Sequence, residues 1–151
     1  MEVKGWIRNG LNAAWIASFL FGFSQQQLPA QTGLSTNSGV YTADQALQGE
    51  AIYTEKCAIC HGDNLQGKDQ NPPLAGDDFL NNWVGQSLGD LDIMIHTTMP
   101  ATHPGSLAQP ETTKLLAYIL SVNKYSAGET ALPSTLKQLR AIHIDKPQAK
   151  P

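Results

Sequence analysis

The sequence predicts an all-α domain of three to five helices joined by long loops, and three observations lead to this prediction. Apolar residues recur at helical spacing in several separate stretches. No segment alternates between apolar and polar residues in the way a half-buried strand does. Between the helical stretches, glycine, proline, asparagine and aspartate gather in clusters that are typical of loops. A chain of 151 residues without internal repeats falls within the size of one such domain.

The first 30 residues have the features of an export signal rather than of a folded segment. Lys4 and Arg8 form a short basic region, residues 11–23 are mostly apolar, and a processing site follows at Ala30. The alternative is a retained membrane anchor, but the apolar run falls short of the ~20 residues that span a bilayer. We therefore expect a signal peptide over residues 1–30, a periplasmic or otherwise exported protein, and no stable membrane span after the leader is removed.

Charge is distributed unevenly along the rest of the chain. Without the leader, 8 Lys and Arg residues stand against 12 Asp and Glu residues, a balance that argues against nucleic acid as a partner.

Residues 31–41 are rich in serine, threonine, asparagine and glycine, with little to bury, and predict a flexible lead-in. Residues 130–151 hold four basic residues against Asp145 alone and contain three prolines, which predicts a basic, solvated C-terminal tail. The folded domain is thus expected over residues 42–129.

The first helix is predicted over residues 43–56. Thr42 followed by Gln45 has the form of a capping box, in which each side chain accepts a hydrogen bond from the other residue's backbone N–H. The residues that recur at helical spacing after this cap are Ala46, Gly49, Tyr53 and Cys57. A glycine inside a helix costs ~1 kcal/mol relative to alanine, so Gly49 indicates that another backbone passes close to it.

The remaining elements follow from the positions of the helix breakers. Residues 62–78 are polar and contain several glycines and two adjacent prolines, which predicts a long ordered loop. Short helices are expected over residues 79–83 and 88–96, the second ending before two further prolines. Pro110 suits the first position of a final amphipathic helix that runs to about Asn123.

The segment Cys57-Ala58-Ile59-Cys60-His61 carries the chemistry of this chain. Its spacing allows two thiols to add to the two vinyl groups of one haem while the histidine presents an imidazole nitrogen to the iron. A thioredoxin-type pair needs a preceding strand, and a zinc site needs two further ligands at closer spacing than the downstream histidines have. A disulfide between the two cysteines would close a loop too small to constrain the unfolded chain much. We therefore predict one covalently attached haem c, bound through Cys57 and Cys60, with His61 as a metal ligand.

The iron in such a site needs a sixth ligand or an open face. Met99 is the preferred ligand because it lies just past a predicted helix, where Pro100 stiffens a loop that can aim the sulfur at the iron. Met94 lies inside that helix among apolar neighbours, which favours core packing. The other candidates are expected at the surface, in loops or in the tail, and they are His96, His103 and His143.

With these residues in place, the sequence resembles the class I, monohaem cytochrome c family over about residues 42–123. The matching features are the first helix with Gly49 and Tyr53, the haem motif, residues 72–76, Trp83, Met99-Pro100 and the last helix. The resemblance implies a small cytochrome c fold packed around one covalently bound haem, in which the first and last helices cross at Gly49.

The same resemblance implies further residues that contact the haem or its ligand. Pro72 would offer its carbonyl to the Nδ1 proton of His61, with Pro73 as the alternative. Leu74 and Trp83 would contact the haem, and Trp83 would donate its indole N–H to a haem propionate, unless it is simply a core tryptophan. In detail, residues 74–107 are similar to cytochrome subunits and domains paired with bacterial quinoprotein dehydrogenases.

As a function, the resemblance implies an electron carrier rather than an enzyme. It would pass single electrons between a redox protein donor, such as a quinoprotein dehydrogenase, and a cytochrome or oxidase acceptor of a respiratory chain. His61 and Met99 would keep the iron six-coordinate in both oxidation states. An acidic rim around the haem would attract a basic surface on the partner. The alternative is a haem enzyme or a gas or redox sensor, which requires an open sixth position on the iron.

Overall fold

The structure, a computed structural model, describes residues 33–148. The predicted signal peptide over residues 1–30, the two residues after it and the last three residues of the tail lie outside the described residues. Within 33–148, none of the helices combines the length and the apolar character that crossing a membrane requires.

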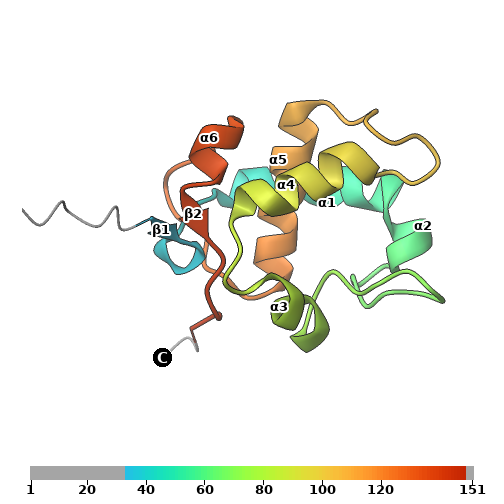
Figure 1. The fold of residues 1–151 in the computed structure, drawn as a ribbon, viewed down its shortest axis with the longest axis horizontal. Coiled ribbons are helices and arrows are strands. Elements are labelled where there is room, and N and C mark those ends of the chain that lie inside the picture. Colours follow the sequence, from blue (N-terminus) through green and yellow to red (C-terminus); the bar gives the residue numbers. More distant parts are fainter. Residues whose placement is uncertain (1–32, 149–151) are drawn as a thin grey trace, which may run out of the picture. The chain divides into compact units, whose positions relative to one another are not determined.

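Helices form the framework of the domain (Figure 1). The longer ones are α1 (Ala43–Lys56), α3 (Asp77–Trp83), α4 (Leu88–Thr98) and α5 (Gln109–Val122). Two helices of four residues each are α2 (Ala58–His61) and α6 (Leu136–Leu139), and a short 3₁₀ helix, η1, spans Thr36–Ser38. The prediction of a helical domain with long loops is therefore confirmed.

Helix α1 begins and ends at the residues that the sequence predicts. The Thr42 hydroxyl accepts a hydrogen bond from the backbone N–H of Gln45 at 3.3 Å, and the Gln45 side chain accepts one from the backbone N–H of Thr42 at 3.3 Å. These two bonds satisfy two of the N–H groups that a helix start leaves without a partner. The helix ends at Lys56 because Cys57, with φ −123° and ψ −36°, leaves the helical conformation.

Helices α1 and α5 pack tightly against each other at Gly49. A Cβ atom placed on Gly49 would lie 2.0 Å from the carbonyl oxygen of Lys114 in α5, so no side chain fits at this position. Tyr53, one turn further along α1, is buried and packs against Tyr118 of α5 with ring centroids 5.4 Å apart. The expectation that another backbone passes close to Gly49 is confirmed, and the α1–α5 pair is the support on which the site is built.

The segment before α1 is more buried than its composition predicts. Strand β1 (Leu34–Ser35) pairs in parallel with strand β2 (Ile142–His143), a pairing that the sequence analysis did not anticipate. Thr36, Val40 and Tyr41 are buried, so the expectation that residues 31–41 have little to bury is wrong. The Tyr41 hydroxyl donates to the carbonyl of Tyr125 at 2.6 Å, which ties this segment to the chain beyond α5.

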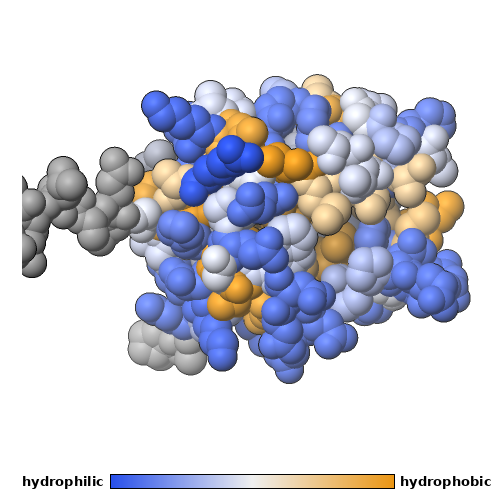
Figure 2. All heavy atoms as spheres, viewed as in Figure 1, coloured by the Kyte–Doolittle hydropathy of each residue, from blue (hydrophilic) through white to orange (hydrophobic). Residues whose placement is uncertain are grey.

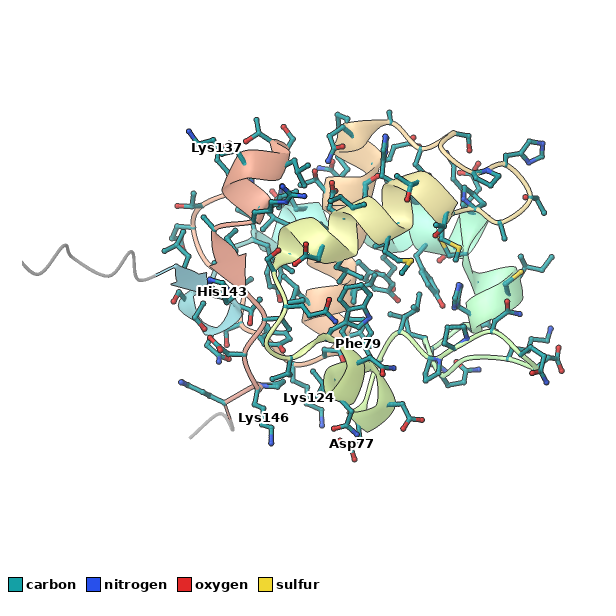
Figure 3. All side chains as sticks on the ribbon, in the orientation of Figure 1. Asp77, Phe79, Lys124, Lys137, His143 and Lys146 are labelled. Carbon is teal, nitrogen blue, oxygen red and sulfur yellow. The ribbon has the colours of Figure 1, made fainter. Side chains whose placement is uncertain are left out.

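The chain beyond residue 130 is a packed part of the domain, and the expectation of a solvated tail is wrong for its described residues. Its buried apolar side chains are Leu132, Leu139, Ile142 and Ile144. The backbone of Ile144 exchanges hydrogen bonds of 2.9 Å with Gly85 and Gln86, just before α4. Basic side chains such as Lys137 and Lys146 point outward instead (Figure 3), so this segment is apolar toward the domain and basic toward solvent.

Candidate functional site

The Cys57–His61 motif folds as one tight turn after α1. The backbone N–H of Cys57 still donates to the carbonyl of Tyr53 at 2.8 Å, and the N–H of His61 donates to the carbonyl of Cys57 at 2.9 Å, which closes α2. The two cysteines are not joined in a disulfide. Cys60 is exposed and Cys57 is half-buried, so both thiols are available to a group that lies against this turn.

The surroundings of Cys57 favour an uncharged sulfur. Burial raises the pKa of its thiol to about 11, the nearby Cys60 adds to the rise, and Lys56 opposes it. The thiol is therefore protonated at neutral pH. A thioether bond also leaves sulfur uncharged, so this half-buried position suits covalent attachment of an apolar group better than it suits a thiolate.

His61 is held in one tautomer by the loop that follows the motif. Its Nδ1 atom lies 2.8 Å from the carbonyl oxygen of Pro72, and the residue is only 6% exposed. A carbonyl oxygen can only accept a hydrogen bond, so Nδ1 carries the proton and Nε2 keeps its lone pair. Nε2 is thus the ring nitrogen that can bind a metal, and the Nδ1 contact is the kind that orients a ligating histidine.

A cavity of about 290 Å³ lies beside the motif. Its wall is mainly apolar and comes from α1, α2, the loop before α3, α3 itself, α4 and α5. The residues that complete the wall, besides those predicted from the sequence, are Tyr53, Lys56, Ile59, Asn71, Pro73, Asn82, Leu91, Met94, Ile95, Pro100, Ala101, Thr102, Leu115 and Ile119. Two free thiols, an imidazole with a free Nε2, a thioether and an apolar wall together fit a haem c.

The structure brings all of the predicted site residues to this single cavity. They come from four different parts of the chain, and they are Cys57, Cys60, His61, Pro72, Leu74, Trp83 and Met99. Met99 is the residue that ends α4, where its extended backbone (φ −116°, ψ 152°) leads the chain out toward Pro100. Trp83 ends α3 and packs against Phe79, with ring centroids 6.4 Å apart.

Of the other candidates for the sixth iron ligand, Met94 lines the cavity and the histidines do not. Met94 does not pack in the core as expected, because its side chain is 48% exposed and lines the cavity. Its sulfur lies 3.6 Å from the hydroxyl of Thr98. His103 and His143 are exposed and lie outside the cavity wall, as does His96, whose Nδ1 atom is buried within α4 without a hydrogen-bond partner among the described residues.

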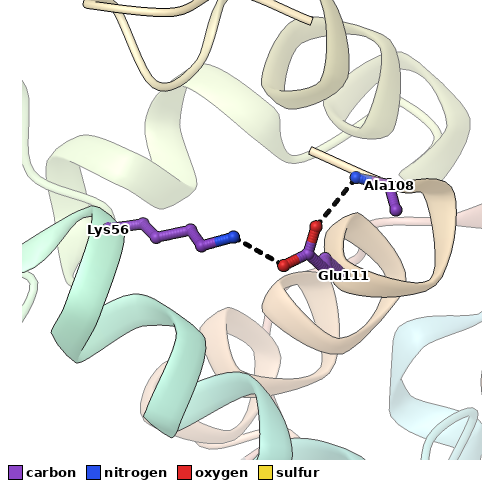
Figure 4. A network of polar contacts seen from close by, with 3 residues as sticks. All are labelled: Lys56, Ala108 and Glu111. Carbon is purple, nitrogen blue, oxygen red and sulfur yellow. Dashed lines mark hydrogen bonds and ion pairs between the residues drawn. The ribbon is translucent and has the colours of Figure 1, made fainter. Parts of the chain in front are cut away.

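The wall of this cavity carries little charge. Among the described residues that line it, the charged one is Lys56, and no carboxylate takes part. Lys56 forms an ion pair of 2.6 Å with Glu111, whose other carboxylate oxygen accepts a hydrogen bond of 2.9 Å from the N–H of Ala108 (Figure 4). Apolar side chains are exposed instead around α2 and α4 (Figure 2), where Ile59 is 79% exposed and Met94 48%.

Tyr53 is a site residue that the sequence analysis did not assign. It lines the cavity, and its hydroxyl donates a hydrogen bond of 2.6 Å to the carbonyl of Gly62, the residue after His61. Burial raises the pKa of the hydroxyl to about 12, so it remains a donor at all ordinary pH values. Its place one turn before Cys57, on the buried face of a predicted helix, was the signal that could have identified it.

Comparisons with known proteins identify relatives of this chain. Residues 44–119 match the protein family described as "Cytochrome C oxidase, cbb3-type, subunit III". The chain is 35% identical over 80 residues to thiosulfate dehydrogenase of Stutzerimonas stutzeri (strain A1501), which covers 49% of this chain and 26% of that protein. Among solved structures, it is similar to the sulfane dehydrogenase SoxCD from Paracoccus pantotrophus with a TM-score of 0.42 and 21% identity, over 58% of this chain and 53% of that chain.

The family match spans half of this chain and includes every predicted site residue. The chain spans about a quarter of the thiosulfate dehydrogenase and about half of the SoxCD chain. The resemblance to cytochrome c that the sequence shows is confirmed. The chain belongs to the cytochrome c family of the cbb3-type oxidase subunit III class, whose domains transfer electrons through covalently bound haem c.

Proposed function

We propose that this protein carries one haem c and shuttles single electrons, with Cys57 and Cys60 as the attachment residues and His61 and Met99 as the iron ligands. One observation carries the proposal: a single apolar cavity brings together two free thiols, a histidine whose Nδ1 is engaged by Pro72, and a methionine. Residues from four parts of the chain would not meet at one cavity in this combination if their role were only to fill a core.

The residues of the chain perform four tasks in this proposal. Cys57 and Cys60 anchor the cofactor, and His61, oriented by Pro72, donates its Nε2 lone pair to the iron. Met99 supplies a thioether, which stabilises the reduced state relative to a second histidine. When bound, the haem supplies a one-electron redox couple. Leu74 and Trp83 keep water away from it, which favours the reduced state further.

The partners of this carrier are proposed from its relatives. The curated relative is a thiosulfate dehydrogenase, so we expect a dehydrogenase as electron donor. A quinoprotein dehydrogenase is the donor that the residue pattern favours, and a cytochrome or oxidase of a respiratory chain is the acceptor. Exchange would take place in the periplasm, which agrees with the export signal expected over residues 1–30.

Optical spectroscopy of the purified protein tests the ligand assignment. We expect a low-spin c-type spectrum with the near-infrared sulfur-to-iron band in the wild type. The band should disappear in Met99→Ala and persist in Met94→Ala, a matched control because both methionines line the same cavity. A band that persists in Met99→Ala and disappears in Met94→Ala would transfer the ligand role to Met94.

The same experiment separates the carrier from its alternative. A high-spin wild type that binds carbon monoxide would indicate an open sixth position and favour a haem enzyme or a gas or redox sensor. Mass spectrometry of the denatured protein completes the test. The carrier hypothesis requires a mass increase of one haem that is lost in the Cys57→Ala/Cys60→Ala double variant, and a mass without covalent haem would reject it.

A further inference from the structure

Asn123 lies at the end of α5 and forms three hydrogen bonds through its side chain amide. The residue is 4% exposed. Its Nδ2 group donates to the carbonyl of Ile119 at 2.9 Å, in the last turn of α5, and to the carbonyl of Leu74 at 3.0 Å. Its Oδ1 accepts from the backbone N–H of Gly76 at 3.0 Å. One buried amide thus fastens the loop before α3 to the end of α5.

The loop that Asn123 holds is the one that carries Pro72. Leu74 is also fixed from the other side, because its N–H donates to the carbonyl of Leu65 at 2.8 Å. Pro72 lies two residues before Leu74, and its carbonyl is the group that engages Nδ1 of His61. The hydrogen bond on His61 therefore depends on a short backbone segment whose position is set from α5.

An amide is the only side chain of this size that can make all three bonds. Aspartate offers two acceptors and no donor, so it would keep the bond from Gly76 and leave the carbonyl of Leu74 without this partner. The carbonyl of Ile119 would still accept from the backbone N–H of residue 123, as it does now at 3.1 Å. An aliphatic side chain would remove the partner of both loop groups, the carbonyl of Leu74 and the N–H of Gly76. The bonds that only the amide supplies go to Leu74 and Gly76, so the side chain of Asn123 holds the loop, whereas its backbone N–H already completes the end of α5.

We propose that Asn123 is a positioning residue for His61, acting through the loop of residues 72–76. This inference rests on the proposed function, in which His61 binds the haem iron. The hydrogen bond from Nδ1 to Pro72 makes His61 a more basic ligand and so stabilises the oxidised iron. Loosening the loop weakens that bond, which shifts the reduction potential upward and opens Nδ1 to solvent.

The test compares haem-loaded wild type with Asn123→Ala and with Ser121→Ala. Ser121 is a matched control because its hydroxyl donates to the carbonyl of Tyr118 at 2.7 Å, in the same last turn, away from the loop. The main measurement is solvent exchange of the His61 Nδ1 proton, followed by NMR in the reduced protein. We expect exchange at least about tenfold faster in Asn123→Ala, with a higher midpoint potential, and no change in Ser121→Ala.

If Asn123→Ala melts at a lower temperature but keeps the wild-type exchange rate and potential, Asn123 only stabilises the fold. If Asn123→Ala does not accumulate, Asn123→Asp gives the same measurement, because it retains the bond from Gly76 and loses the two donated bonds. A wild type without a histidine-ligated haem rejects the proposed function itself, and that result is read from the wild-type spectrum before any variant is compared.

Discussion

The Nδ1 atom of His61 lies 2.8 Å from the carbonyl oxygen of Pro72, a contact that joins the haem motif to the loop eleven residues further along the chain. Because the acceptor is a backbone carbonyl, its chemical identity does not depend on the side chain at position 72. It depends on the path of the loop, which is fixed by Leu65 on one side and Asn123 on the other. The orientation of the proposed iron ligand is therefore a property of the fold.

Replacing His61 should separate haem attachment from haem ligation. We expect His61→Gln to retain covalent haem, because both cysteines remain, but to lose the low-spin spectrum. The measurements are a haem stain of the denatured protein and an optical spectrum of the native one. His103→Gln is the control, since His103 is exposed and lies outside the cavity wall. A low-spin His61→Gln protein would show that another residue ligates the iron.

Gly49→Ala should destabilise the haem-loaded protein by about 1–3 kcal/mol or more, because α1 and α5 must move apart to admit the new methyl group. The added carbon would lie 2.0 Å from the carbonyl oxygen of Lys114. Chemical denaturation followed by far-UV circular dichroism measures this change. Gln48→Ala, at an exposed position of the same helix, should leave stability nearly unchanged. Equal stability of Gly49→Ala and the wild type would contradict the close helix crossing.

Leu139→Ala tests whether the C-terminal segment is part of the core. Leu139 is fully buried, so we expect a loss of about 2–5 kcal/mol in the free energy of unfolding. Leu136, in the same helix, is 38% exposed, and Leu136→Ala should cost much less. Thermal denaturation of the two variants side by side gives the comparison. Similar losses in both would indicate that α6 does not pack as described.

The ion pair between Lys56 and Glu111 should make stability depend on acid pH. The hydrogen bond from Lys56 is the main cause that lowers the pKa of Glu111 below its ordinary value of 4.5. Because the pKa of Glu111 is lower in the folded protein than in the unfolded chain, its ionised carboxylate stabilises the folded state. This contribution to the free energy of unfolding is complete above about pH 4.5 and is lost as the pH falls through the folded pKa. Both side chains are partly exposed, at 30% and 29%, so we expect only a small effect.

Melting temperatures of wild type and Glu111→Gln between neutral and strongly acidic pH check this dependence. Glutamine can still accept the hydrogen bond from Ala108, so the variant removes the charge and keeps the cap. The wild type should melt slightly higher at neutral pH, and the two curves should converge in acid. Glu129→Gln, an exposed carboxylate outside this network, should show no such convergence. If the melting temperatures of wild type and Glu111→Gln differ by the same amount at every pH, the ion pair is not the source of the difference.

Features that depend on neighbouring residues could be predicted from the sequence. The start of α1 follows from the capping box of Thr42 and Gln45, because both hydrogen bonds close within one turn. The close approach at Gly49 follows from the cost of glycine inside a helix, although nothing local names Lys114 as the residue that it meets. The spacing of Cys57, Cys60 and His61 predicts haem attachment, since a single turn is enough to present all three groups.

Features that depend on contacts between distant residues were decided by the tertiary structure. Leu139, Ile142 and Ile144 are too few and too widely spaced to signal a core segment, and they are buried because α6 packs against α4 and β2 pairs with β1. Met94 is exposed because its part of α4 faces the cavity rather than another helix. Asn123 meets Leu74 and Gly76 across 49 and 47 residues. A hydrogen-bonded turn is specified by adjacent residues, whereas burial and long-range hydrogen bonds exist only once the helices have packed.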